Sequence, residues 1–235
     1  MKTLDGVTLL SFLTSTDEAV DVEDQSVGIL DATLRSLRHS ASKMDFGAVK
    51  LIAPIDEKID GIEVDTIDSI PTEEYSRFCV EELVNHVDTE YCLCVQWDSA
   101  IIDEQLWDDS FLSYDYIGPP WHTHNGYQNR VGNGGFSLRS KKFLEEASSV
   151  TYDPLIPCPW MATRGGRITE DWLLCVYNYE HMLEKGVKFA DPVTAARFAV
   201  EHPLDEKFYF RDKIDTYESF GFHGAFNVAG MEQIR

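Results

Sequence analysis

The sequence predicts an α/β protein with a mostly parallel central sheet and helices on both faces. The pattern of apolar residues favours this class. Apolar runs of strand length alternate with stretches whose apolar residues recur at helical spacing. No segment rich in Gly, Ser or Pro divides the 235 residues, 43% of which are hydrophobic, so one domain spanning 1–235 with a sizeable core is expected.

The first hundred residues are expected to contain three strands and two helices. Strands are predicted over Val7–Ser15, Val49–Pro54 and Tyr91–Asp98, and helices over Val22–His39 and from Pro71 onward. The first helix is predicted from apolar residues that recur at helical spacing from Val27 to Leu37. The second begins with glutamates that suit the positive end of a helix dipole.

The remaining residues continue the alternation. Strands are expected over Tyr114–Pro120, Gly134–Leu138 and Val187–Ala190, with helices over Lys141–Ala147 and Glu170–Glu184 capped by Ser140 and Thr169, and a last segment over Pro192–Glu201. Ligands of open α/β sheets bind beyond the carboxyl ends of the strands. Asp98, which follows a strand directly, is expected at that edge.

Charge and cysteine content narrow the function classes. A net charge of −21 argues against nucleic-acid binding and against an anionic membrane surface. The apolar run Val7–Leu13 is too short to span a membrane, and neither a transmembrane segment nor a signal peptide is expected. Five cysteines without a CxxC pair do not form a disulfide or zinc framework, which favours a reducing, cytoplasmic location. The oligomeric state is left open.

Several polar residues have both a structural and a chemical interpretation. Asp98 suits a Mg²⁺ or Mn²⁺ ligand, or the cap of a turn. Glu170 and Asp171 suit a helix dipole, or a base that takes a proton from a hydroxyl. His223 suits a buried core histidine or a ligand-binding position between glycines, and His122 a loop or substrate contact.

The stretch RVGNGGFSLRS, residues 130–140, is not a phosphate loop, because it lacks the lysine of that motif and leads into a strand. A structural turn and a surface for a sugar or nucleotide remain equally open. Trp121 and Trp160 offer flat faces for carbohydrate rings, or core packing. Guanidinium groups of Arg77, Arg130 and Arg139 match a diphosphate, although surface ion pairing is the better expectation for Arg139.

Taken in order, these motifs resemble a known family. The set comprises Tyr75–Phe78 (YSRF), Val95–Asp98 (VQWD), Tyr116–Trp121 (YIGPPW), Val131–Ser140 (VGNGGFSLRS), Glu170–Asp171 and Phe220–Gly224 (FGFHG). It is similar to a mostly bacterial family of predicted GT-A type glycosyltransferases, catalogued as a domain of unknown function. The resemblance covers roughly residues 71–224.

The resemblance implies a GT-A-like domain with a nucleotide-binding half over about 1–100 and an acceptor-side half over about 101–235. It implies Asp98 and His223 as ligands of Mn²⁺ or Mg²⁺, and Asp171 as base with Glu170 as the alternative. Donor contacts would come from Gln96, Trp97, Arg77, Arg130, Asn133, Gly134 and Gly135, and acceptor contacts from Trp121, His122 and Trp160. Gln96 replaces the first acid of the usual metal motif, which leaves a weaker cation site.

The implied reaction is an inverting transfer of a sugar from a nucleotide-sugar to a carbohydrate or glycoconjugate acceptor, as in polysaccharide biosynthesis. Two other classes stay open. A nucleotidyltransferase would need a basic, glycine-rich loop near the first strand, and residues 11–24 contain none. A non-catalytic carbohydrate- or nucleotide-binding protein on the same fold would lack transfer activity while keeping the ligand site.

Overall fold

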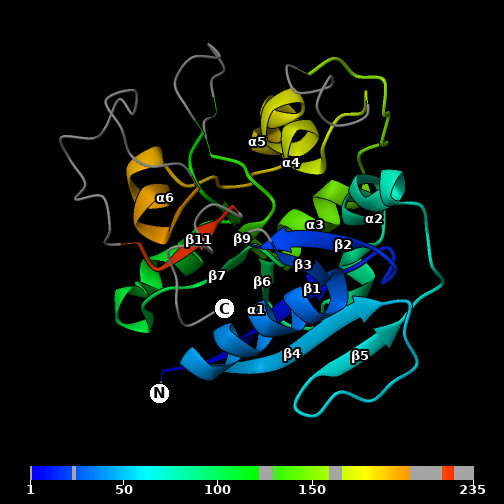
Figure 1. Cartoon of the computed structure of the whole chain (residues 1–235). Helices are drawn as coiled ribbons and strands as arrows, with labels where there is room; N and C mark the ends of the chain where they lie inside the picture. The colour runs from blue at the N-terminus through cyan, green and yellow to red at the C-terminus, as the bar shows by residue number, and fades with distance from the viewer. Residues whose placement is uncertain are drawn as a thin grey trace.

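The computed structural model describes residues 2–22, 25–121, 129, 131–158, 166–201 and 219–224. It confirms the α/β class (Figure 1). In this part of the chain the central sheet has six strands in the order β5-β4-β1-β6-β9-β8. The strands are β1 (Thr3–Phe12), β4 (Asp45–Ala53), β5 (Glu63–Thr66), β6 (Tyr91–Val95), β8 (Tyr116–Ile117) and β9 (Phe136–Ser140). The first four in spatial order are parallel, and β9 runs antiparallel to both of its neighbours.

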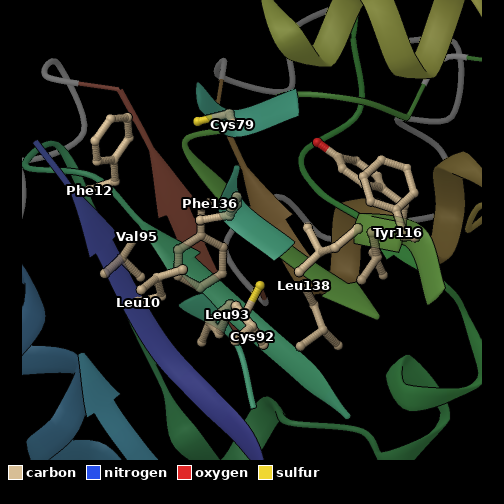
Figure 2. Close-up of a cluster of buried hydrophobic side chains, with 14 of the residues drawn as sticks. Leu10, Phe12, Cys79, Cys92, Leu93, Val95, Tyr116, Phe136 and Leu138 are labelled. Carbon is tan, nitrogen blue, oxygen red and sulfur yellow. The ribbon is translucent and has the colours of Figure 1, made fainter. Parts of the chain in front are cut away.

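The centre of the sheet is buried on both faces. Every residue from Val7 to Phe12 of β1 is buried, as expected for a parallel strand covered by helices on each side. Figure 2 shows part of this core, where Leu10, Val95 and Phe136 from three neighbouring strands lie in one cluster. All five cysteines are free thiols.

Helices flank this sheet. They are α1 (Ile29–Lys43), α2 (Tyr75–Glu81), α3 (Lys141–Ser148), α4 (Glu170–Trp172), α5 (Tyr179–Glu184) and α6 (Pro192–Phe198), with 3₁₀ turns η1 (Thr72–Glu74), η2 (Leu83–His86), η3 (Glu104–Leu106) and η4 (Asp109–Ser113). Helix α1 packs on β1 and β4, and α2 packs against α3 and α4. Within the described residues, no helix is long and apolar enough to cross a membrane.

A second, smaller sheet matters for the site. It consists of β10 (Ala199–Val200), β11 (Gly221–His223) and β7 (Ser99–Ile101) in that order. Strand β11 is parallel to β10 and antiparallel to β7, and it packs beside β9 (Figure 1). This sheet therefore brings the end of the described chain next to the turn that follows β6.

Some predicted boundaries are wrong. The helix predicted from Val22 begins at Ile29, because residues Gln25–Gly28 form β3 and pair with β2 (Ala19–Val22) in a hairpin. Val27 fits the helical spacing, but its backbone pairs with Val20, and Gly28 is extended with ψ 136°.

The later segments also differ in detail. The helix predicted over Glu170–Glu184 is interrupted between α4 and α5 by a π-helical turn, η7 (Leu173–Tyr177). Instead of the strand predicted over Val187–Ala190, Phe189 makes a single bridge to Tyr116. Ser140 caps α3 as predicted, since its hydroxyl accepts from the amide of Phe143 at 3.0 Å. Thr169 stands at a helix start without a side-chain cap bond.

Candidate functional site

Asp98 and His223 meet at the carboxyl end of β6. In the small sheet, His223 of β11 lies opposite Ser99 of β7, so the histidine is next to the residue that follows Asp98. Asp98 Oδ1 lies 3.5 Å from His223 Nε2, with 13% and 12% of the two side chains exposed. The Gly224 amide also donates to the Asp98 carbonyl at 2.9 Å. The two predicted metal ligands are therefore neighbours.

His223 is held from its other side by Glu201. The Glu201 Oε1 atom lies 3.2 Å from His223 Nδ1. Burial lowers the pKa of His223, but the hydrogen bond with Glu201 and the negative charges of Asp98, Glu201 and Asp171 outweigh it and raise the pKa above its ordinary value. Glu201 is the final residue of the last segment expected over Pro192–Glu201, and nothing in the local sequence indicates its partner.

The glycine stretch forms a tight turn before β9. Asn133 adopts φ 61°, a left-handed conformation that asparagine tolerates better than most residues. Its side-chain oxygen accepts from the Gly135 amide at 3.1 Å, and its carbonyl accepts from the Tyr116 hydroxyl at 3.1 Å. The Gly135 carbonyl accepts from the Ser99 hydroxyl at 2.7 Å and from the Gln96 amide at 3.0 Å. These bonds tie the turn to the loop that carries Asp98.

The glycines of this turn leave space for protein side chains. A Cβ on Gly134 would clash with Glu170 Oε1, and one on Gly135 would clash with the His223 ring. A Cβ on Gly132 would clash with the Trp121 ring. Close packing within the protein thus requires glycine here. Contact with a sugar, the ligand-binding interpretation of the stretch, stays a prediction.

Glu170 and Asp171 have different surroundings at the start of α4. Glu170 is 5% exposed; its Oε2 accepts from the Ser76 hydroxyl at 3.1 Å. Asp171 is partly exposed, and its Oδ2 accepts from the Gly134 amide at 3.2 Å, while its Oδ1 accepts from the Trp172 amide at 2.7 Å. Of the two candidate bases, only Asp171 has both a fixed carboxylate and access to solvent.

The expectation of surface ion pairing for Arg139 is wrong. Arg139 is 2% exposed, and its Nη2 lies 3.6 Å from Glu170 Oε1. It also donates to the Gly134 carbonyl at 3.2 Å and to the Ser137 hydroxyl at 2.9 Å. Burial and the charge of Asp171 raise the pKa of Glu170, although Arg139 works in the opposite direction. The only signal in the sequence is an arginine within an otherwise uncharged strand.

Other predicted site residues contact the protein itself. Gln96 donates to the Tyr75 hydroxyl at 2.8 Å, and Trp97 packs on the core. Arg77 pairs with Glu74 at 2.6 Å and with Glu81 at 3.9 Å, as in the surface ion-pair interpretation. The Trp121 ring lies 5.3 Å from that of Trp172. Arg130, His122 and Trp160 lie outside the described residues.

The residues present fit part of a cation site. Within the described ranges, no group of three or more His, Cys, Asp or Glu side chains is arranged to hold a metal ion. Asp98 and His223 provide two ligand types for a divalent cation. Two ligand atoms bonded at about 2.1 Å are roughly 3.0–3.4 Å apart, close to the separation of Oδ1 and Nε2. Mg²⁺ and Mn²⁺ sites that use so few protein ligands complete their coordination with phosphates and water.

The chain is similar in sequence to one family and in fold to several solved structures. The family described as "Protein of unknown function (DUF5672)" matches residues 59–223. No curated protein matches the chain. The fold is similar to that of the galactosyltransferase LgtC in complex with donor and acceptor sugar analogues, at a TM-score of 0.51 and 11% identity, covering 92% of this chain and 86% of that one. This likeness shows the predicted GT-A-like fold.

Two further solved structures give lower TM-scores. One is a glycosyltransferase involved in the glycosylation of the major capsid of PBCV-1, with a TM-score of 0.48, 13% identity, and 97% and 94% of the two chains covered. The other is a nucleotidyl transferase from Methanothermobacter, with a TM-score of 0.42, 11% identity, and 81% and 90% of the two chains covered.

The buried ion pair predicts a pH-dependent loss of stability in Arg139→Met. Removing one partner leaves the Glu170 carboxylate buried and unpaired, which costs about 3–5 kcal/mol near neutral pH. A carboxyl group with a raised folded-state pKa favours folding most at pH values below its unfolded pKa, and this contribution is lost as the pH rises through the folded value. The loss in Arg139→Met should therefore be smaller at pH 5 than at pH 8. Urea denaturation at both pH values measures it.

Arg77→Met is the matched control, since Arg77 is also ion-paired but 41% exposed. Exposed pairs contribute about 0–1 kcal/mol, so this variant should lose little stability at either pH. Equal losses in the two variants, or a loss in Arg139→Met that does not change with pH, would contradict the buried-pair assignment.

Proposed function

We propose that this chain, which belongs to the family described as "Protein of unknown function (DUF5672)", is a glycosyltransferase that moves a sugar from a nucleotide-diphosphate-sugar to an acceptor hydroxyl. The GT-A-like fold supports transferase chemistry. One observation carries the proposal. The Asp98–His223 pair and the Asp171 carboxylate meet at the glycine turn, where the His223 ring packs against Gly135 and Asp171 accepts from the amide of the adjacent Gly134.

Asp171 is the general base in this proposal. Its carboxylate is oriented by the amides of Gly134 and Trp172 and remains partly exposed. The carboxylate takes the proton of the acceptor hydroxyl while the hydroxyl oxygen bonds to the anomeric carbon. The bond from that carbon to the nucleotide diphosphate breaks on the opposite face, so the configuration inverts. Glu170 does not take this role, because it is buried against Arg139.

The excess of negative charge around the glycine turn favours a bound cation. Among the described residues around the glycine turn, the four carboxylates of Asp98, Glu170, Asp171 and Glu201 outnumber the guanidinium of Arg139 and the imidazole of His223. Arg139 is already paired with Glu170, and an incoming diphosphate would meet net negative charge. Asp98 and His223 would hold a Mn²⁺ or Mg²⁺ ion, which when bound offsets the charge that develops on the leaving diphosphate.

The remaining contacts are proposals that follow the same arrangement. Asn133, Gly134 and Gly135 would line the donor, together with Gln96, Trp97, Arg77 and Arg130, and Trp121, His122 and Trp160 would contact the acceptor. Because Gln96 is neutral and bonded to Tyr75, it adds no carboxylate to the cation site. The donor diphosphate should consequently strengthen the binding of a cation that Asp98 and His223 alone hold weakly. A carbohydrate or glycoconjugate acceptor and a cytoplasmic location complete the proposal.

Asp171→Asn should abolish transfer while donor binding is kept. The amide has nearly the shape of the carboxylate but cannot accept the proton, and a general base contributes about 10²–10⁴-fold to the rate. Turnover of nucleotide-sugars with a panel of carbohydrate acceptors measures kcat, and calorimetry measures the Kd of the donor. Asp56→Asn, an exposed change in the loop after β4, is the control for a lost charge. Near-normal turnover of Asp171→Asn would remove Asp171 from the base role.

Donor binding should depend on a divalent cation and on Asp98. A thermal-shift panel of nucleoside diphosphates and nucleotide-sugars, with and without Mn²⁺, tests this because a ligand of the folded state raises Tm by mass action. A ligand at about 100 times its Kd adds about 2.7 kcal/mol, and thus several degrees for a chain of this size.

We expect the shift only with Mn²⁺ present, and its loss in Asp98→Ala. Transfer activity that is unaffected by EDTA would contradict the cation part of the proposal. Formation of nucleotide-sugar from a nucleoside triphosphate and a sugar phosphate would instead identify a nucleotidyltransferase. Ligand-induced shifts without hydrolysis or transfer would identify a binding protein.

A further inference from the structure

Glu201 is a candidate part of the site that no sequence motif indicated. It follows β10 directly, and β10 pairs in parallel with β11, with Val200 opposite Phe222. The next residue of each strand is therefore Glu201 on one side and His223 on the other. Their side chains meet, with Glu201 Oε1 3.2 Å from His223 Nδ1 and 17% of the Glu201 side chain exposed.

The contact with Glu201 selects one tautomer of the neutral His223 ring. An ionised carboxylate can only accept hydrogen bonds, so the proton must be on Nδ1. In the neutral ring the lone pair is then on Nε2, the nitrogen that lies 3.5 Å from Asp98 Oδ1. The ring also has little freedom to turn away, because Nε2 and its neighbours pack where a Cβ of Gly135 would be.

We propose that Glu201 is a positioning residue for a divalent cation, which it serves by holding the His223 ring with its Nε2 lone pair directed toward Asp98. The inference rests on the cation site of the proposed function. Metal-binding histidines commonly donate their second N–H to a carboxylate, which fixes the tautomer and increases the basicity of the ligand nitrogen. Glu201 contacts the nitrogen opposite the Asp98 side, and so it acts through His223 and does not bind the cation itself.

The Kd of Mn²⁺, measured by electron paramagnetic resonance of the unbound ion without donor or acceptor, tests this. Loss of such a partner typically weakens metal affinity about 10–100-fold, which we expect for Glu201→Ala. Glu201→Gln keeps an oxygen that accepts from Nδ1–H, and it should lose clearly less affinity. Glu57→Gln, an exposed change between β4 and β5, removes one negative charge elsewhere and should leave the Kd unchanged.

The tautomer gives a readout that needs neither metal nor turnover. The ¹⁵N chemical shifts of the His223 ring, assigned by comparison with His223→Gln and recorded at a pH where the ring is neutral, should report a proton on Nδ1 in the wild type. Glu201→Gln should keep this tautomer. Glu201→Ala, with its fold checked by circular dichroism, should populate the Nε2–H form.

Each alternative result overturns the inference in a recognisable way. An Nε2–H tautomer in the wild type, or an unchanged Mn²⁺ affinity in a folded Glu201→Ala, excludes positioning by Glu201. An equal loss in Glu201→Gln and Glu201→Ala makes Glu201 a direct ligand. If the wild type does not bind Mn²⁺ but transfers sugar, the cation site is excluded and the glycosyltransferase proposal stands. If the wild type binds Mn²⁺ but transfers no sugar, the cation site stands and the glycosyltransferase proposal is excluded.

Discussion

The buried ion pair between Arg139 and Glu170 is the interaction on which the candidate site depends. Withdrawing two charges from water costs several kcal/mol per ion, which is offset only where further hydrogen bonds satisfy both groups. Here the Ser76 hydroxyl donates a hydrogen bond to Glu170, and Arg139 donates hydrogen bonds to the Ser137 hydroxyl and the Gly134 carbonyl. The pair thereby connects β9, α2, α4 and the glycine turn. With Glu170 fixed inward, the next residue of α4, Asp171, reaches the Gly134 amide.

The small sheet supplies the other half of the site. Strand β11 lies between β10 and β7, and this pairing brings His223 to Asp98 and to Glu201, residues that are far apart in the chain. The bare Cα of Gly135 admits the His223 ring, just as that of Gly134 admits Glu170. The two glycines of this turn thus leave room for one side chain each, His223 and Glu170. A larger residue would separate the proposed base from the proposed cation ligands.

The sequence predicts the alternation of strands and helices and indicates most of the residues that gather at the candidate site. Hydrophobic periodicity and the ends of strands can be recognised from the local sequence. The sequence does not indicate what depends on pairing between distant segments. Val27 fits the apolar spacing of a helix, but it belongs to the strand that pairs with β2 in a hairpin. Arg139 is buried because Glu170 folds back onto its strand, and Glu201 matters only through its position beside β11. The π-helical turn after α4 adds an irregularity that no spacing rule indicates.

The central claim is that the glycine turn brings a base and a pair of cation ligands to one nucleotide-sugar. A crystal structure of the chain with Mn²⁺ and a non-hydrolysable nucleotide-sugar tests it most directly. The account predicts the metal between Asp98 Oδ1 and His223 Nε2, the diphosphate bound to that metal, and the sugar next to Gly134 within reach of Asp171. A nucleotide-sugar bound away from the glycine turn, with no metal bound by Asp98 and His223, would contradict it.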